Sequence, residues 1–254
     1  MTTATLTIDL NADVSEGCGQ DDKLLTIVSS ANICCGLHAG SPSEILKTLK
    51  LAKQQGLRVG AHPSFDDRAN FGRTNHELPD DEIKAVLLYQ LGAIQSLCDW
   101  VGVSLDYVKP HGALYNQAAK DAHLANVIVE TIKGFNPKLA IMGLSGSELI
   151  KATQQHGIVA ESEVFADRRY EENGALVARS QPNAVIDNDD EALAQVLQMI
   201  KDSSVTSVNG KTIKVQADSI CLHGDSEHAV QFAKRIQAEL QQQGIAIQAK
   251  SNLK

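Results

Sequence analysis

Short runs of β-branched and other apolar residues alternate along the chain with longer stretches in which apolar residues recur every three or four positions. A short apolar run is typical of a buried strand, whereas the wider spacing is typical of one face of a helix. The alternation therefore predicts repeated β-α units around a parallel sheet. The predicted strands are Leu6–Leu10, Ala31–Cys34, Arg58–Ala61, Asp106–Val108, Leu139–Met142, Ile158–Ser162 and Ser219–Leu222.

Polar residues next to the helical stretches mark where helices begin and end. Ser41 is a candidate N-cap, Pro42 suits the first helical position, and Glu44 completes a capping box. This helix is expected to end at Gly56, and a second helix is expected to begin near Pro79. Further helices are predicted at Asp121–Lys133, Ser147–Gln155, Glu191–Lys201 and Glu227–Gln243.

One segment breaks this rhythm before the last predicted strand. Two β-branched runs within residues 204–217 flank Asn209-Gly210, a pair that favours the two-residue type I′ turn of a β-hairpin. We therefore expect an antiparallel excursion there, inserted into a single catalytic domain that covers residues 1–254.

The number of predicted strands points to the fold class. About seven parallel strands separated by helices indicate a β/α barrel of seven or eight strands, for which 254 residues are sufficient. An open doubly wound sheet is the main alternative. No GxGxxG motif follows a strand and no Walker A pattern occurs, so neither nucleotide-binding fingerprint is present.

Charge and cysteine content narrow the environment and the partners. Lys and Arg number 23 against 31 Asp and Glu, a formal net charge of −8, and no basic cluster occurs. Nucleic acid and anionic membranes are therefore poor partners, and no apolar run approaches the roughly 20 residues that cross a bilayer. Five cysteines without a CxxC pair indicate the reducing cytoplasm rather than a disulfide framework.

Polar side chains flanked by glycine or proline follow five of the predicted strands. In a β/α barrel the working residues project from the C-terminal ends of the strands. A single strand-end histidine is usually structural, but four of the eight histidines at matching positions indicate one shared site. These strand-end residues are Asn11, Asp13, His38, His62, Lys109, His111, His223 and Asp225.

This set of residues fits hydrolysis at a carbonyl or amide. Aspartate and histidine bind divalent metals or move protons near neutral pH. Lys109 offers a fixed cation for a carboxylate, a phosphate or an oxyanion, although a strand-end lysine can also simply reach solvent.

Two further segments carry charge near the predicted strand ends. Glu163, Asp167 and Arg168 combine acids with an arginine that suits an anionic substrate, and the alternative is a surface ion-pair network. Arg73 is a weaker candidate, which either reaches the site or ties its loop down. The adjacent Cys34 and Cys35 are expected to be small buried residues rather than a redox or metal pair.

Eight strings occur in a fixed order over nearly the whole chain: IDLNADVSEG, SSANICCGLHAG, GAHPSFDD, FGR, YQLGAI, VKPHGALYN, E-x-FADRRY and ICLHGD. Read together, they resemble the LamB/YcsF family, the A subunits of ATP-dependent 5-oxoprolinases. The resemblance implies a seven-stranded β/α barrel related to glycoside hydrolase and deacetylase barrels. It also implies cleavage of 5-oxo-L-proline to L-glutamate with ATP hydrolysis, together with the B and C subunits of the 5-oxoprolinase as partners.

The resemblance also implies roles for the residues that match the family's motifs. ATP would bind at a site that this chain can share with a partner, and a divalent metal would be held by Asp13, His38 and His62, where deacetylases place their acid and metal ligands. Lys109 and Arg168 would hold the substrate carboxylate or a transferred phosphate. The implied catalytic residues are Asp13, His62, Lys109, His111, Glu163 and His223, and the implied substrate-binding residues are Asn11, His38, Arg73, Asp167, Arg168 and Asp225.

Two other functions compete with this interpretation. The first is a metal-dependent deacetylase or amidohydrolase that acts without ATP. The aromatic content of 4% argues against a carbohydrate substrate, because sugar sites usually stack the sugar on aromatic rings. The second is a non-catalytic subunit of a complex, and the density of ionisable strand-end residues argues against it, because burying them would cost free energy without benefit.

Overall fold

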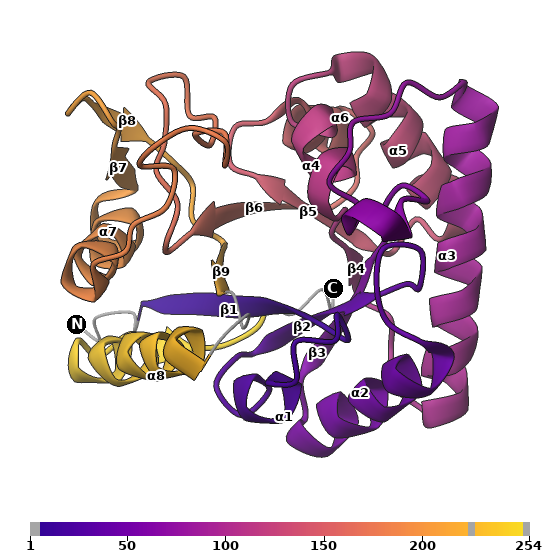
Figure 1. The fold of residues 1–254 in the computed structure, drawn as a ribbon, viewed down its shortest axis with the longest axis horizontal. Helices are drawn as coiled ribbons and strands as arrows, with labels where there is room; N and C mark the ends of the chain where they lie inside the picture. The colour runs from indigo at the N-terminus through magenta and orange to yellow at the C-terminus, as the bar shows by residue number, and fades with distance from the viewer. Residues whose placement is uncertain (1–5, 223–226, 251–254) are drawn as a thin grey trace.

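The computed structural model describes residues 6–222 and 227–250. Seven parallel strands pair in the order β1-β2-β3-β4-β5-β6-β9, and β9 pairs in turn with β1, so the sheet closes into a barrel (Figure 1). The predicted seven-stranded β/α barrel is confirmed, and the open sheet is ruled out. The strands are β1 (Thr7–Val14), β2 (Ser30–Cys34), β3 (Arg58–His62), β4 (Tyr107–Val108), β5 (Ala140–Leu144), β6 (Ala160–Phe165) and β9 (Ser219–Leu222).

Helices cover the outside of the barrel (Figure 1). As predicted, Ser41 caps the second of them, its hydroxyl accepting a hydrogen bond from the Glu44 amide at 3.3 Å, and Gly56 ends it with a φ of 68°. The helices are α1 (Asp21–Leu24), α2 (Pro42–Gln55), the 3-10 turn η1 (Arg68–Asn70), α3 (Asp80–Val101), α4 (Gly112–Ala118), α5 (Ala122–Phe135), α6 (Glu148–Gln155), α7 (Asp189–Asp202) and α8 (Glu227–Gln242); a short strand β10 (Ala246–Ile247) follows.

Strand β1 shows how the sequence divides the two faces of the barrel. Its apolar residues Ile8, Leu10, Ala12 and Val14 alternate with Asp9, Asn11 and Asp13. Because successive side chains of a strand point to opposite faces, the apolar set packs toward the helices and the polar set points into the barrel. The hydrophobic core therefore lies between strands and helices, and the barrel interior is polar.

The polar interior is held together by hydrogen bonds between strands. Asp9 accepts from the hydroxyls of Ser29 at 2.6 Å, Ser30 at 2.7 Å and Ser219. Arg58 and Glu161 form a bidentate ion pair, both contacts measuring 2.8 Å. The carboxylates of Asp9 and Glu161 and both terminal nitrogens of Arg58 thus have partners, as buried groups in native proteins usually do.

Residues 204–217 contain the expected antiparallel pair, β7 (Ser204–Thr206) with β8 (Thr212–Lys214). The predicted type I′ turn is wrong, because it needs a positive φ at both central residues and only Gly210 has one, at 79°. Five residues connect the strands, and the Ser207 amide donates to the Lys211 carbonyl at 2.9 Å. In such longer connections a single left-handed glycine is enough to turn the chain.

Three strands reach two or more residues further than predicted. β1 continues from Leu10 to Val14, β5 from Met142 to Leu144, and β6 from Ser162 to Phe165. The polar residues in these extensions face the polar interior, where their alternation with apolar residues is the pattern of a strand and not of a loop. No helix within residues 6–222 and 227–250 is both long enough and apolar enough to cross a membrane.

Candidate active site

Charged side chains from four strands meet at one end of the barrel. Asp13 lies near the end of β1, His62 is the last residue of β3, Lys109 directly follows β4, and Glu163 lies in β6. Asp13, His62 and Lys109 line a cavity of about 750 Å³. The structure therefore brings these three strand-end side chains together at one cavity.

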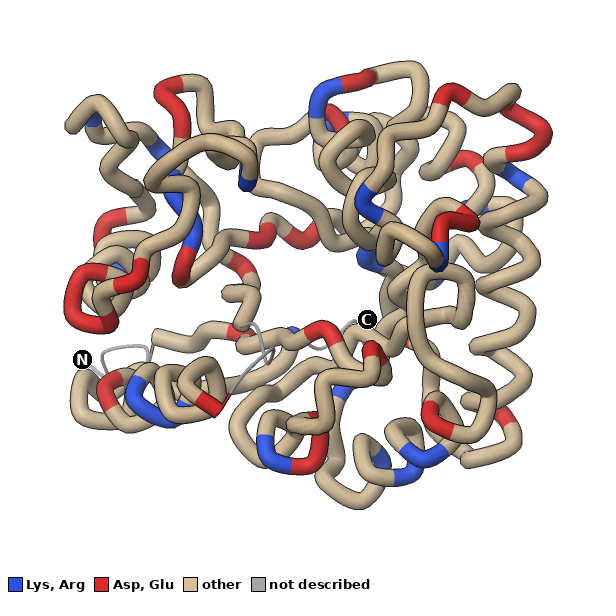
Figure 2. The backbone as a smooth tube through the Cα atoms, in the orientation of Figure 1, with Lys and Arg blue, Asp and Glu red and all other residues tan. Residues whose placement is uncertain are grey.

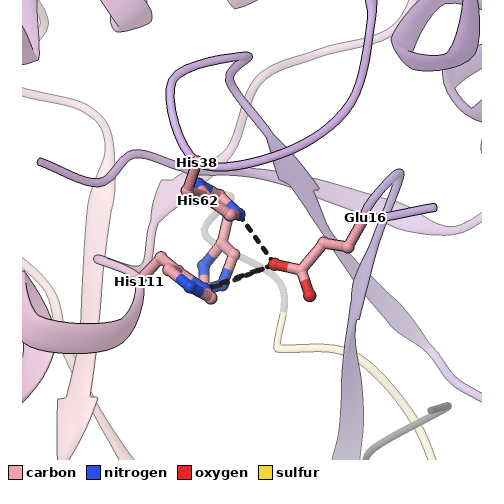
Figure 3. A group of neighbouring side chains, drawn as sticks. All are labelled: Glu16, His38, His62 and His111. Atoms are coloured by element: carbon pink, nitrogen blue, oxygen red, sulfur yellow. Dashed lines mark hydrogen bonds and ion pairs between the residues drawn. The ribbon is translucent and has the colours of Figure 1, made fainter. Parts of the chain in front are cut away.

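Glu16 and three histidines form a compact group beside this cavity (Figure 3). One potential ligand atom from each of Glu16, His38, His62 and His111 lies within 4.8 Å of the others. The Glu16 carboxylate is 2.8 Å from His38 Nε2 and 3.3 Å from His111 Nδ1. The rings of His38 and His111 stack with their centroids 3.8 Å apart.

Backbone carbonyls set the protonation of two of the rings. His62 Nδ1 is 2.7 Å from the Lys109 carbonyl oxygen, and His111 Nε2 is 2.9 Å from the Phe71 carbonyl oxygen. Because a carbonyl only accepts, both of these nitrogens carry protons. The remaining nitrogens, His62 Nε2 and His111 Nδ1, face each other at 2.9 Å, so only a shared proton or a bound cation satisfies both lone pairs.

The charges around the histidines favour that extra positive charge. Burial alone would lower the pKa of His62, but the Asp13 carboxylate at 3.3 Å raises it above the ordinary value. Burial would raise the pKa of Glu16, but its hydrogen bonds to His111 and His38 lower the pKa to about 2. Glu16 is therefore ionised at neutral pH. Burial lowers the pKa of His38 to about 4, so this ring is neutral.

These observations fit a divalent transition metal. Three imidazole nitrogens and one carboxylate oxygen are a donor set typical of zinc and related ions. Metal-bound histidines usually donate their second N–H to a carbonyl, as His62 and His111 do here. Within the described part of the chain, the buried Nδ1 of His38 has no hydrogen-bond partner, which leaves it as a further donor atom.

Lys109 is clamped between two carboxylates. Its ammonium lies 2.9 Å from Asp13 Oδ1, 2.7 Å from Glu163 Oε1 and 3.1 Å from Asn11 Oδ1, and the residue is only 2% exposed. Burial would lower the pKa of Lys109, but Asp13 and the other nearby acidic groups raise it well above the ordinary value. The side chain therefore stays charged. Tyr115 supports the clamp by donating its hydroxyl to Glu163 Oε2 at 2.7 Å.

Burial and the same cation act in opposite directions on Asp13. Burial alone would raise its pKa, but His62 and Lys109 hold the pKa well below the usual range. Asp13 also accepts a hydrogen bond from Asn32 at 2.8 Å. It is therefore an ionised carboxylate in a fixed orientation at the cavity wall.

Arg168 is a buried cation of the cavity wall for which the described residues supply no acidic partner within ion-pair distance. It is 6% exposed, and its Nε and Nη2 donate to the carbonyls of Ala184 at 3.3 Å and Val177 at 2.6 Å. Among the residues that the structure describes, no carboxylate lies within 4.0 Å of the guanidinium. A buried unpaired charge is costly, so this position favours an anionic ligand.

The other predicted residues take different places. Arg73 lies exposed on the cavity wall, 4.9 Å above the Phe71 ring. Asn11 is fully buried beneath Lys109, and His38 lies behind His111. Asp167 is half-buried next to Arg168, and its carbonyl accepts from the Ile186 amide. His223 and Asp225 fall outside the described residues.

Cys34 and Cys35 are buried, and burial raises the pKa of both thiols. Cys34 Sγ contacts the Ser15 carbonyl at 2.9 Å. Both residues therefore agree with the structural role expected for them.

Sequence reasoning missed Glu16 and Tyr115. Glu16 stands three residues after Asp13 in the LNADVSEG string, and Ser15 between them adopts a left-handed φ of 66° that turns the chain at this point. Tyr115 lies in α4, one helical turn after His111. The sequence signal that could have found them is their position. Glu16 lies in the same string as Asp13, and Tyr115 lies in the same string as His111.

A family model described as LamB/YcsF matches residues 8–254. The chain belongs to the LamB/YcsF family. It is 58% identical to the A subunit of a 5-oxoprolinase from Histophilus somni over 240 residues, which cover 94% of this chain and 97% of the relative.

Solved structures support the same family and fold. A lactam utilization protein from Thermus thermophilus shares 37% identity, with a TM-score of 0.90 over 96% of this chain and 100% of its own. A family 4 carbohydrate esterase from Streptomyces lividans aligns with a TM-score of 0.53 at 11% identity, over 98% of this chain and 95% of its own. The second likeness shows a shared fold with that esterase class and no more.

Proposed function

We propose that this LamB/YcsF chain is the catalytic A subunit of a 5-oxoprolinase. It would convert 5-oxo-L-proline, ATP and two water molecules to L-glutamate, ADP and phosphate. The observation that carries the proposal is the 58% identity, over almost the full length of both chains, to the A subunit of the Histophilus somni 5-oxoprolinase. The ionised groups around the cavity supply the chemistry that the reaction needs.

The chemistry of the substrate explains the need for ATP. A five-membered lactam is a stable amide whose nitrogen is a poor leaving group. Transfer of the γ-phosphoryl group to the lactam oxygen, with ADP leaving, makes the ring carbon electrophilic. One water then adds to that carbon, the C–N bond breaks as the nitrogen takes a proton, and a second water releases the phosphate. Glutamate and inorganic phosphate remain.

Two cations are placed for an acidic lactam. Arg168, buried without a carboxylate partner among the described residues, binds the substrate carboxylate. Lys109, held charged by Asp13 and Glu163, stabilises the negative charge of the phosphoryl group as it passes to the lactam oxygen. Asn11 and Tyr115 hold this clamp in place rather than touching the substrate.

Asp13 acts as the general base that takes a proton from the attacking water, because it is ionised and lines the cavity. His62 orients it at 3.3 Å. The residues that would hold a divalent metal are Glu16, His38, His62 and His111. Compared with the set implied by the sequence, Glu16 and His111 are added and Asp13 is left out. A metal there supplies Lewis acidity and lowers the pKa of bound water.

The relatives are each the A component of a 5-oxoprolinase, which supports an enzyme of several subunits. We expect the B and C subunits to complete the reaction, with the ATP site on this chain or shared with a partner. The cytoplasmic location stays a prediction.

The test is coupled turnover in the complex. The chain is mixed with candidate B and C subunits, and phosphate and glutamate release are measured with and without 5-oxoproline. Asp13→Asn is expected to lower turnover about 100- to 10,000-fold, the usual contribution of a general base. Asp99→Asn, an exposed change on α3, is the matched control and should leave turnover unchanged.

Two results would count against the proposal. Near-normal turnover of Asp13→Asn would remove Asp13 from the chemistry. Glutamate release that needs no ATP and stops with a chelator would support the ATP-independent amidohydrolase, which the metal-like donor set favours as the second candidate.

A further inference from the structure

The cavity is much larger than the lactam. Its volume of about 750 Å³ lies in the range of pockets for drug-sized ligands, whereas 5-oxoproline is a single small ring with a carboxylate. The residues already assigned to the reaction come from strand ends on the barrel side of this cavity. The remaining wall comes from the loops and helices above them, and we call this part the outer chamber. Its charged residues are Arg73, Lys120, Glu148, Lys151, Glu171 and Arg179.

The outer chamber is cationic although the protein is acidic. Four basic residues face two acids there, while the whole chain carries a formal charge of −8. Lys151 pairs with Glu148 at 2.7 Å, so these two charges cancel. Within residues 6–222 and 227–250, no carboxylate lies within ion-pair distance of Arg73 or Lys120. Figure 2 shows Lys and Arg, interspersed with Asp and Glu, on the segments around the barrel opening.

The unpaired cations are spread over a distance that one carboxylate cannot span. Lys120 follows α4, whose seven residues Gly112–Ala118 rise about 1.5 Å each, so it lies roughly 10 Å beyond His111 along the helix axis. Arg168 already suffices for the single carboxylate of the lactam. An elongated ligand with several negative charges is required to engage the others.

We propose that the outer chamber binds the triphosphate of ATP, with Arg73 and Lys120 contacting its phosphates and the γ-phosphoryl group directed toward Lys109. This assignment rests on the proposed function and adds the place of the nucleotide, with Lys120 as a residue that no motif indicated. Both side chains are on loops and lack acidic partners in the described chain, so they are available to phosphate oxygens. It also explains how a chain without a Walker A pattern holds a nucleotide: through side-chain cations instead of a glycine-rich loop.

The experiment measures ATP binding and turnover separately. Isothermal titration of the full chain with MgATP gives Kd, and tripolyphosphate is used as a competitor. In the reconstituted complex, KM is measured for ATP and for 5-oxoproline. Lys120→Gln and Arg73→Gln are each expected to raise Kd or KM for ATP about tenfold, the effect of one charge-assisted contact, and to leave KM for 5-oxoproline unchanged. Lys50→Gln, an exposed change on α2, is the matched control.

Several outcomes would overturn the assignment. The first is the absence of saturable ATP binding, both by the chain alone and in the complex. The second is that the variants raise KM for 5-oxoproline instead, and the third is that they change neither constant. Failure of tripolyphosphate to displace ATP would also overturn it. A wild-type complex that binds ATP but does not consume 5-oxoproline would refute the proposed function and leave the nucleotide site standing.

Discussion

Replacing Tyr115 with phenylalanine removes a single hydroxyl from the clamp around Lys109. That hydroxyl donates to the Glu163 carboxylate at 2.7 Å, and Glu163 is 0% exposed. Phenylalanine fills the same space, so no cavity opens. Loss of a hydrogen bond to a buried charged group costs about 1.5–3 kcal/mol. The cost stays below the ~3–5 kcal/mol of an uncompensated buried charge, because Lys109 remains 2.7 Å from the other oxygen.

The free energy of unfolding is best measured by urea denaturation followed by far-ultraviolet circular dichroism. Fluorescence is a poor probe, because the only tryptophan, Trp100, is 81% exposed. A chain of this size should lose about 2–4 °C in Tm for each kcal/mol. Tyr89→Phe, at a residue that is 67% exposed, is the control and should change nothing. A Tyr115→Phe variant within about 0.5 kcal/mol of wild type would refute the reasoning, since that is the range of neutral surface changes.

Two other changes test the interior and the metal group. Arg58→Met should destabilise the protein by about 3–5 kcal/mol because it leaves Glu161 charged and buried, and the double variant Arg58→Met/Glu161→Leu should recover most of that loss in urea unfolding. A double variant as unstable as the single one would contradict this. Glu16→Gln should weaken zinc binding, measured by competition with a chelating dye. The loss should exceed the roughly 10–100-fold seen when a residue that only hydrogen-bonds to a metal ligand is changed, because Glu16 would itself be a ligand. Equal zinc affinity in Glu16→Gln and in the surface control Glu44→Gln would remove Glu16 from the donor set.

The alternation of apolar runs was sufficient to predict the barrel, because burial on both sides of each strand leaves a strong pattern. It was insufficient for the ends of β1 and β6, where Asn11, Asp13 and Glu163 alternate with apolar residues. Because the barrel interior is polar, strand segments that face it carry polar side chains at alternate positions. In the sequence such segments resemble loops, although their polar side chains contact other polar groups and not solvent. The number of barrel strands was therefore predicted correctly, while the C-terminal ends of β1, β5 and β6 were not.

The site was predictable where it depends on topology. Asp13, His62 and Lys109 lie at the C-terminal ends of the parallel strands β1, β3 and β4, and such ends must meet at one rim of the barrel. Glu16 was not predictable, because its place depends on the left-handed Ser15 and not on a periodic pattern. Tyr115 depends on the short helix α4, which has no side-chain N-cap and so no start signal in the sequence.

Closure of the barrel by β9 also constrains how the protein emerges from the ribosome. Asn11 on β1 bonds to Ser219 on β9, 208 residues later. At about 5–20 residues per second, synthesis of that interval takes roughly 10–40 s, during which one side of β1 has no strand to pair with. An unpaired strand edge is a template for association with other chains. The nascent protein thus needs the edge of β1 shielded from other chains throughout its synthesis. Truncation anywhere before β9 leaves an open sheet with two unpaired edges.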